Sequence, residues 1–444
     1  MGAQWVSDSR STGPLSGSAL SSRQKNPPTR RPFSVPHHVA LPQVSHIMTD
    51  TPRNIVIVCT SAPWHPGPRA RMIPLAAYGV RQGIPVTLLC LDPCARTTPT
   101  HATTIDGVAV IPVAQMHVGA DGAALRGLSL VWTALCAIVA FTRELMRRQP
   151  TDIVIAKAQP MNGIAACIAG WWCGARLHLD SDDDEAGSHH SAHWFMQHLL
   201  GMFERWLPSH VTTTTCATDW QTERLRARGV TSVSTIPNGL SDKQLTQPGA
   251  HQLLAIRLQY GLPPTYIVYA GNLSTGAHAV DLLIEAYAAA AVNVPLVIAG
   301  SGHERAALHQ LAQQRHCEQT IRWLGNIPIG DIPALLAGAI ASVDPVRQCD
   351  AAAARCPLKI LESMAQGTPV ITSDVGDRSQ ILGPAGIYTA PGHVAAYATA
   401  IRTVCAGSPQ AQNGVTDMRA YSWQTIAPRW YTAHGLVPTE VAYA

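Results

Sequence analysis

Charged residues are scarce in this chain: Asp, Glu, Lys and Arg supply 14% of its 444 residues, whereas apolar types supply 46%. So low a charge content, with so many apolar side chains, predicts a chain that folds over most of its length. The formal net charge is only +4. Because this excess is small and spread along the chain, we do not expect a nucleic-acid-binding protein.

Metal-binding patterns are missing too. None of the eleven cysteines forms a C-x-x-C pair or a cluster with histidine at zinc spacing. We therefore expect no metal and no cofactor. In a chain this long, such cysteines indicate buried free thiols in a reducing compartment, and we expect a cytoplasmic protein.

A long hydrophobic run is also absent. The longest apolar stretch, residues 128–142, is shorter than the ~20 residues that a membrane-spanning helix needs. It predicts a helix that is buried or docks on a surface, and peripheral contact with the inner face of the membrane stays open. Residues 1–52 lack the apolar core of a secretory signal and are rich in Ser, Arg and Pro, so we expect a disordered tail.

Apolar strands alternate with helical patterns from residue 53 on. In the first half the helices are expected at residues 71–82 and 125–148. The strands are expected at residues 54–59, 86–91, 108–113, 153–156, 177–179 and 211–214, the last of which should end the series. Such alternation predicts βαβ crossovers in a parallel sheet, and so a doubly wound domain over residues 53–245.

A second series of the same kind occupies residues 246–415. Its strands are expected at residues 266–270, 295–299, 321–324, 341–343 and 369–372, with helices at 281–290 and 304–314. The sequence thus predicts two Rossmann-like doubly wound α/β domains facing each other across a cleft. Because ligands of such sheets bind beyond the carboxyl ends of the strands, we expect both domains to direct their sites at that cleft.

The most informative stretch is PLKILESMAQGTPVITSD at residues 357–374. Lys359 and Glu362 lie three apart on its predicted helix, so both side chains can meet one ligand. A lysine suits phosphate and a carboxylate suits paired ribose hydroxyls, which together suit a nucleoside diphosphate. An exposed i,i+3 ion pair on an ordinary helix would show the same spacing.

This stretch resembles the C-terminal signature of family 4 glycosyltransferases, P-x-K-x-x-E-x-M-A-x-G-x-P-V-I. Other segments agree in order and spacing: IPNG at 236–239, GNL at 271–273, LVIAGSG at 296–302, WLG at 323–325 and YSW at 421–423. The resemblance covers residues 53–432 and is most specific in the second half. It implies the GT-B architecture, with a closing segment at 416–444 that crosses back to the N-terminal domain.

The resemblance implies a retaining glycosyltransferase that moves a sugar from a sugar nucleotide to a saccharide or lipid-linked acceptor, as in polysaccharide biosynthesis. It places Glu362 on the ribose of the nucleotide and Lys359 on a phosphate. Gly300 and Gly302 would let the backbone approach the donor closely, although a tight turn without a ligand would also explain them.

Two departures from the family pattern concern donor binding. A second glutamate, eight positions before Glu362, is replaced by Ala354. The arginine and lysine common in the opening loop are replaced by Asn272 and, after a one-residue insertion, by a residue near His278. Arg355 is a candidate to compensate for the missing cation.

In the N-terminal half, the loop after the first strand contains Gly67, Arg69 and Arg71. The family resemblance places this loop near the donor phosphates, so the two arginines are candidates to stabilise the departing diphosphate. Exposed loop arginines without a ligand are the alternative.

Residues 180–185, DSDDDE, follow a strand and gather five carboxylates. They could contact acceptor hydroxyls, hold a divalent cation or form a solvated loop. We expect acceptor contacts from Asp180 or Asp182, and rank the cation last because enzymes of this architecture generally lack a bound metal. His178, His189 and His190 flank the loop, and relatives often have a histidine or aspartate here that touches the donor sugar. His178, Asp180 and Asp182 are therefore catalytic candidates, and a packed or exposed histidine without a catalytic role is the alternative.

Two rival functions fit the same fold. Ala354 and Asn272 would also suit a sugar-nucleotide-binding or scaffolding protein without transfer activity. A nucleotide-sugar epimerase would keep the architecture and change the reaction. Intact Lys359 and Glu362 favour an enzyme over a scaffold, and the 357–371 pattern favours a transferase over an epimerase.

Overall fold

The computed structural model describes residues 53–65, 67–95, 101–119, 125–188, 194–276, 278–407 and 418–437. The predicted disordered tail, residues 1–52, lies outside the described residues, as do His189 and His190.

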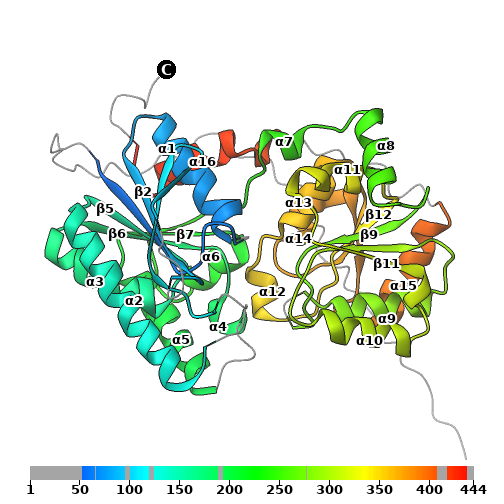
Figure 1. Ribbon diagram of the computed structural model, residues 1–444, viewed down its shortest axis with the longest axis horizontal. Coiled ribbons are helices and arrows are strands. Elements are labelled where there is room, and N and C mark those ends of the chain that lie inside the picture. The colour runs from blue at the N-terminus through cyan, green and yellow to red at the C-terminus, as the bar shows by residue number, and fades with distance from the viewer. Residues whose placement is uncertain are drawn as a thin grey trace, which may run out of the picture. The chain divides into compact units, whose positions relative to one another are not determined.

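Among the described residues, an eight-stranded sheet organises the first half of the chain (Figure 1). Its order is β3-β4-β2-β1-β5-β6-β7-β8, and every pair except β3–β4 is parallel. The strands are β1 (Ile55–Cys59), β2 (Val86–Asp92), β3 (Thr103–Ile105), β4 (Val108–Gln115), β5 (Asp152–Ala156), β6 (Arg176–Ser181), β7 (Thr213–Cys216) and β8 (Val233–Thr235). The predicted doubly wound parallel sheet is confirmed.

Two edge strands of this sheet were not predicted. The expectation that the series ends near residue 214 is wrong, because β8 pairs with β7 beyond it. Only the first of the three residues of β8 is buried, so it carries no apolar run to reveal it. At the other edge β3 forms a hairpin with β4 through Asp106 and Gly107, both with positive φ. An Asp-Gly turn is a strong hairpin signal that the apolar pattern alone does not register.

Helices cover both faces of this sheet. The helices of this half are α1 (Ile73–Arg81), α2 (Gly127–Arg148), α3 (Pro160–Cys173), α4 (Glu185–Ser188), α5 (Trp194–Trp206) and α6 (Asp219–Arg226). α2 and α3 share one apolar cluster with the sheet, and Phe203 of α5 packs against it. α1 packs on the opposite face. Strand side chains alternate between the two clusters, as the pleat requires.

A six-stranded parallel sheet organises the second half, again counting described residues only, in the order β11-β10-β9-β12-β13-β14. Its strands are β9 (Ile267–Ala270), β10 (Leu296–Ala299), β11 (Ile321–Gly325), β12 (Ala341–Val343), β13 (Val370–Ser373) and β14 (Gly386–Thr389). Its helices are α7 (Asp242–Leu245), α8 (Ala250–Gln259), α9 (Val280–Ala290), α10 (Arg305–Gln314), α11 (Ile332–Ala337), α12 (Asp350–Ala354), α13 (Leu358–Ala365), α14 (Arg378–Leu382) and α15 (Val394–Cys405). Of these six strands, only β14 was not expected from the sequence.

The last described helix, α16 (Trp423–Ala433), belongs to the apolar cluster of the first sheet rather than to the second. Ser422 caps it by accepting the N–H of Thr425. Trp430 and Tyr431 are buried against α1. The approach is so close that a methyl group added at Gly79 would fall 2.0 Å from the Tyr431 hydroxyl. The chain thus returns to its N-terminal half after the second sheet is complete.

Candidate active site

Two glycine-containing loops lie against each other at the carboxyl edge of the second sheet. Gly300, with φ of +138°, follows β10, and an added Cβ would fall 1.8 Å from the carbonyl oxygen of Gly271. At Gly302 an added Cβ would fall 2.1 Å from the carbonyl oxygen of Leu273. Both glycines are therefore required by contact between the loops, whether or not a donor also approaches them.

Lys359 projects from α13 to the same edge. Its Nζ lies 3.2 Å from Asp344 Oδ1 and 4.6 Å from the centre of the Tyr269 ring. Burial lowers the pKa of Lys359, and Asp344 only partly offsets this effect. Asp344 also accepts a hydrogen bond from Arg378 Nε at 2.8 Å. Although burial opposes it, the charges of Arg378 and Lys359 hold the pKa of Asp344 well below its usual range.

The cation Arg355 and the imidazole of His278 lie near Lys359. Burial, together with the charges of Lys359 and Arg355, lowers the pKa of His278 to about 2, so its imidazole is neutral. Arg355 Nη2 lies 3.4 Å from Asp183. Asn272, which stands where relatives have an arginine, is exposed. The structure therefore brings together two of the residues considered as substitutes for the missing phosphate-binding pair.

Glu362, one turn further along α13, bonds elsewhere than to Lys359. Its Oε1 accepts a hydrogen bond from Gln244 Nε2 of α7 at 2.7 Å. Burial raises the pKa of Glu362 to about 7, despite the opposing influence of Gln244 and Lys359. The alternative of an ordinary i,i+3 ion pair is therefore not what the structure shows. A partly buried carboxyl group held by one amide keeps further acceptor capacity for a ligand.

Arg71 and Asp180 are buried against each other. Arg71, whose side chain is 1% exposed, donates from Nε and Nη2 to the two carboxylate oxygens at 2.9 and 2.8 Å. It also donates to the carbonyl oxygens of Ile236 and Pro237. The structure does not support the expectations that Arg71 meets the diphosphate and Asp180 an acceptor, because both side chains are buried and bonded to protein partners. Arg71 instead holds the linker that follows β8 in place through these hydrogen bonds.

His178 is also enclosed. Its Nε2 lies 3.1 Å from Asp152 Oδ1 and its Nδ1 lies 2.7 Å from Thr213 Oγ1. The same threonine hydroxyl contacts Nδ1 of His434, just after α16, at 2.7 Å. Since the His178 side chain is fully buried, this geometry gives it no route to a substrate, and its contacts tie α16 to the sheet. Of the first-loop candidates, Arg69 is exposed and Gly67 is the residue that precedes the short π-helix η1 (Pro68–Met72).

The acidic loop is neutralised from within the protein. Lys157 Nζ lies 2.8 Å from Glu185, 3.5 Å from Asp182 and 3.8 Å from Asp183. Burial raises the pKa of Asp182. These internal ion pairs differ from all three arrangements expected for the loop, namely acceptor contacts, a bound cation and a solvated surface. Asp182 and Asp183, each with part of its side chain exposed, are the members of the loop that a ligand could still reach.

Several important residues were missed by the sequence patterns. Lys157 and Asp344 each follow the last residue of a parallel strand, β5 and β12. That position is where such sheets place functional side chains, so the rule applied to the glycines would have found both. Lys157 also has φ of +69°, a strained conformation for a non-glycine residue. Gln244 carries no comparable signal, because its contact with Glu362 joins two separate helices.

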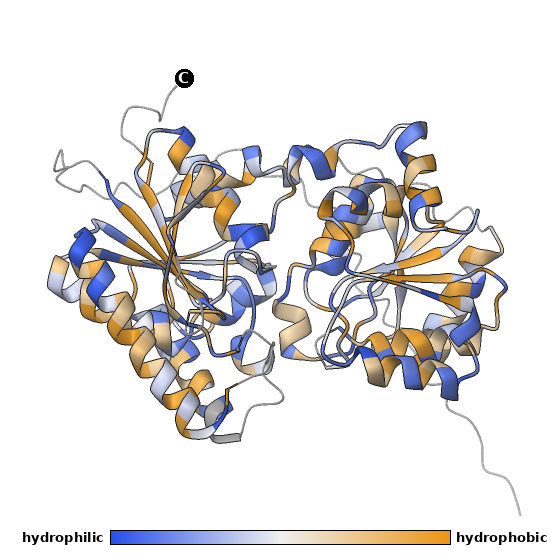
Figure 2. Ribbon diagram, viewed as in Figure 1, coloured by the Kyte–Doolittle hydropathy of each residue, from blue (hydrophilic) through white to orange (hydrophobic). Residues whose placement is uncertain are grey.

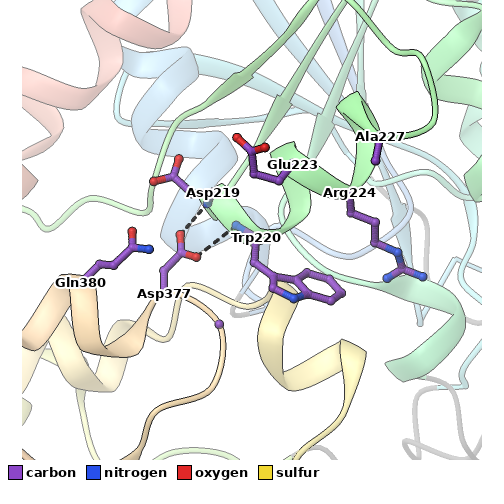
Figure 3. A pocket seen from close by; sticks show the side chains of 8 residues that line it. Asp219, Trp220, Glu223, Arg224, Ala227, Asp377 and Gln380 are labelled. Atoms are coloured by element: carbon purple, nitrogen blue, oxygen red, sulfur yellow. Dashed lines mark hydrogen bonds between the residues drawn. The ribbon is translucent and has the colours of Figure 1, made fainter. Parts of the chain in front are cut away.

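A pocket of about 480 Å³ lies elsewhere, between α6 and residues 376–380. In Figure 3 the Asp377 carboxylate accepts the backbone N–H groups of Asp219 and Trp220. None of the predicted site residues lines this pocket. We therefore place the candidate site at Lys359 and Glu362 and not here.

Two family models match the chain in order. Residues 67–239 match the glycosyl transferase 4-like domain, and residues 264–406 match the glycosyl transferases group 1. The chain is 29% identical to glycogen synthase of Mycobacterium tuberculosis (strain CDC 1551 / Oshkosh) over 173 residues, 37% of this chain and 41% of that protein. It is 29% identical to the GDP-mannose-dependent alpha-(1-6)-phosphatidylinositol dimannoside mannosyltransferase of Mycobacterium tuberculosis (strain ATCC 25177 / H37Ra) over 226 residues, 48% of this chain and 55% of that protein. The chain thus spans about half the length of these relatives, or less.

The fold has a close counterpart among solved structures. Sucrose-phosphate synthase from Thermosynechococcus elongatus superposes with a TM-score of 0.70 at 18% identity, covering 86% of this chain and 98% of that one. Because the identity is only 18%, this structural similarity establishes the fold and nothing more. With both domain models matched in their expected order, the chain belongs to the group 1 glycosyltransferases, the family 4 type with GT-B architecture.

Proposed function

We propose that the protein is a retaining glycosyltransferase that takes a sugar from a sugar nucleotide and passes it to a saccharide or glycolipid acceptor. The observation that carries this proposal is the arrangement on α13. Lys359 presents a cation and Glu362 a carboxyl group with spare acceptor capacity, one turn apart. A lysine suits the diphosphate, and a carboxylate suits the two ribose hydroxyls.

The surrounding residues support a phosphate site. Arg355 and the neutral His278 lie near Lys359, and either can donate to a phosphate oxygen. Ser274 Oγ, in the loop after β9, is buried without a hydrogen-bond partner among the described residues. An incoming diphosphate would compete with Asp183 for Arg355. Charge placed where the leaving group becomes negative favours its departure.

The acceptor side of the proposal rests on two carboxylates of the acidic loop. Asp182 and Asp183 are our candidates for acceptor hydroxyls, because they retain exposure at the carboxyl edge of the first sheet. Retention of configuration is proposed from the family, and the donor sugar is left to experiment. A phosphatidylinositol dimannoside mannosyltransferase that depends on GDP-mannose is among the relatives, so GDP-mannose belongs in the donor panel.

The test is a transfer assay with a panel of sugar nucleotides and saccharide acceptors, with NMR assignment of the product's anomeric configuration. We expect a product with the donor's configuration, and loss of its formation in Glu362→Ala but not in Lys243→Ala. An inverted product would overturn retention. Donor sugar epimerised without transfer would identify an epimerase, and nucleotide binding without any turnover would identify a scaffold.

A further inference from the structure

The outer surfaces of α2, α3 and α5 expose an unusual number of large apolar side chains. Leu128 on α2 is 88% exposed and Trp171 on α3 is 83% exposed. We call the following set the apolar face: Leu128, Val131, Trp132, Leu135, Val139, Ile164, Ile168, Trp171, Trp172, Leu199, Met202 and Trp206. In Figure 2 most of the length of α2 is coloured hydrophobic.

These three helices form one layer. α2 packs along α3, and an added Cβ at Gly163 of α3 would fall 2.5 Å from the ring of Phe203 on α5. The layer covers the sheet through an inner stripe of α2 that includes Ala137, Phe141 and Leu145. The apolar face is therefore the side of the layer turned away from the sheet, and it runs across neighbouring helices rather than sitting on one.

α2 is unlike the core helix of a soluble domain. It has 22 residues and a mean hydropathy of 1.5 over its most apolar window, yet only 22% of that window is buried. By length and composition this one helix, among the described residues, could cross a membrane, which the 15-residue run in the sequence did not suggest. Because its inner stripe is already packed against the sheet, lying on a membrane fits this helix better than crossing one.

The charged residues around the apolar face indicate which kind of surface it would bind. Both acidic residues of the three helices are engaged: Glu144 pairs with Arg147 and Arg148, and Glu204 accepts the N–H groups that begin α4. Exposed arginines accompany the face on these helices or beside them: Arg126, Arg143, Arg147 and Arg205. A second copy of the chain would bring these like charges together, which disfavours self-association.

We propose that the apolar face docks peripherally on a lipid bilayer that contains anionic lipids. Tryptophan favours the interface between headgroups and acyl chains, and here four tryptophans belong to the face. The arginines would add attraction to anionic headgroups over about one Debye length. This attachment does not depend on the transfer activity proposed above, since none of its residues belongs to the candidate site.

The test uses the full chain and co-sedimentation with vesicles of phosphatidylcholine alone or mixed with phosphatidylglycerol. We expect binding to the mixed vesicles that weakens with added salt, and a blue shift of tryptophan fluorescence on binding. Trp171→Ser/Trp172→Ser should reduce partitioning by about tenfold or more, because both exposed side chains lose their apolar contact. Arg143→Gln should weaken binding at low salt only.

The matched control is Leu258→Ser on α8, which removes a side chain that is 72% exposed but lies outside the apolar face. It should bind vesicles as the unaltered chain does. Equal binding by the double tryptophan variant would overturn the proposal, as would no binding to either kind of vesicle. A dimer in sedimentation equilibrium that the tryptophan substitutions dissociate would assign the face to a second copy instead. A cooperative thermal unfolding transition, measured on the same samples, shows independently of any ligand whether each variant is folded.

Discussion

Burial disfavours the charged states of both Glu362 and Lys359. Burial raises the pKa of the Glu362 carboxyl to about 7 and lowers that of the Lys359 ammonium. Groups with such shifted pKa values cluster at functional sites. The nearby Asp344 has the opposite character, because two cations keep it ionised. The pKa shifts therefore distinguish the two residues predicted to bind the donor, Lys359 and Glu362, from Asp344, a structural carboxylate beside them.

Glu362→Gln should stabilise the nucleotide-free protein. A carboxyl whose pKa is about 7 when folded and about 4.5 when unfolded favours folding below pH 4.5, and this contribution is lost as the pH rises through 7. The substitution removes that loss, so the increase in unfolding free energy should be larger at pH 8 than at pH 5, by up to about 3 kcal/mol. Thermal or urea unfolding at the two pH values measures it. An equal effect at both would show that Glu362 is not held in a raised-pKa state.

Lys157→Met should destabilise the protein strongly. The substitution leaves Asp182, Asp183 and Glu185 without their shared cation, and an unpaired buried charge costs about 3–5 kcal/mol. Lys243→Met is the matched control, because Lys243 is exposed. Urea unfolding should separate the two variants clearly. Similar midpoints would mean that solvent already screens the acidic loop.

At the scale of elements, the second sheet depends on the contact between the loops after β9 and β10. Gly300→Ala should lower the unfolding free energy by about 1–3 kcal/mol, since the new methyl meets the backbone oxygen of Gly271. Gly330→Ala is the control, because an added Cβ there meets nothing within 4 Å. Differential scanning calorimetry of both variants tests this, and matching melting temperatures would contradict the tight packing of these loops.

The sequence predicted the elements with long apolar runs and missed those set by partners. β1, β5 and β10 are buried along their whole length, so their runs of Ile, Val and Ala identify them. β8 is a short edge strand with one buried residue and leaves no such trace. The same distinction applies to the candidate site. Lys359 and Glu362 could be proposed from the sequence because they belong to one local motif. The burial of Arg71 against Asp180, by contrast, joins residues 109 positions apart and cannot be read from spacing.

At the scale of the whole molecule, contacts from distant parts of the sequence meet at the linker after β8. Arg71 fastens residues 236 and 237, and Asn238 donates to the carbonyl oxygen of Cys356, shortly before α13. α16 packs on the first half after the second sheet is complete. His434→Ala should therefore weaken the attachment of α16 by about 1–3 kcal/mol, because it removes the two hydrogen bonds between the His434 ring and the hydroxyls of Thr213 and Thr215. Amide hydrogen exchange in α16 would show faster opening, and unchanged protection would contradict this.

The most direct test of the central claim is the melting temperature of the full chain against a panel of nucleoside diphosphates and sugar nucleotides. A ligand present at 100 times its Kd stabilises the folded state by about 2.7 kcal/mol. We predict that one nucleoside diphosphate raises the melting temperature of the unaltered chain and of Lys243→Ala by several degrees, and that Glu362→Ala abolishes the increase. No shift with any nucleotide, or an undiminished shift in Glu362→Ala, would contradict the placement of a donor nucleotide on α13.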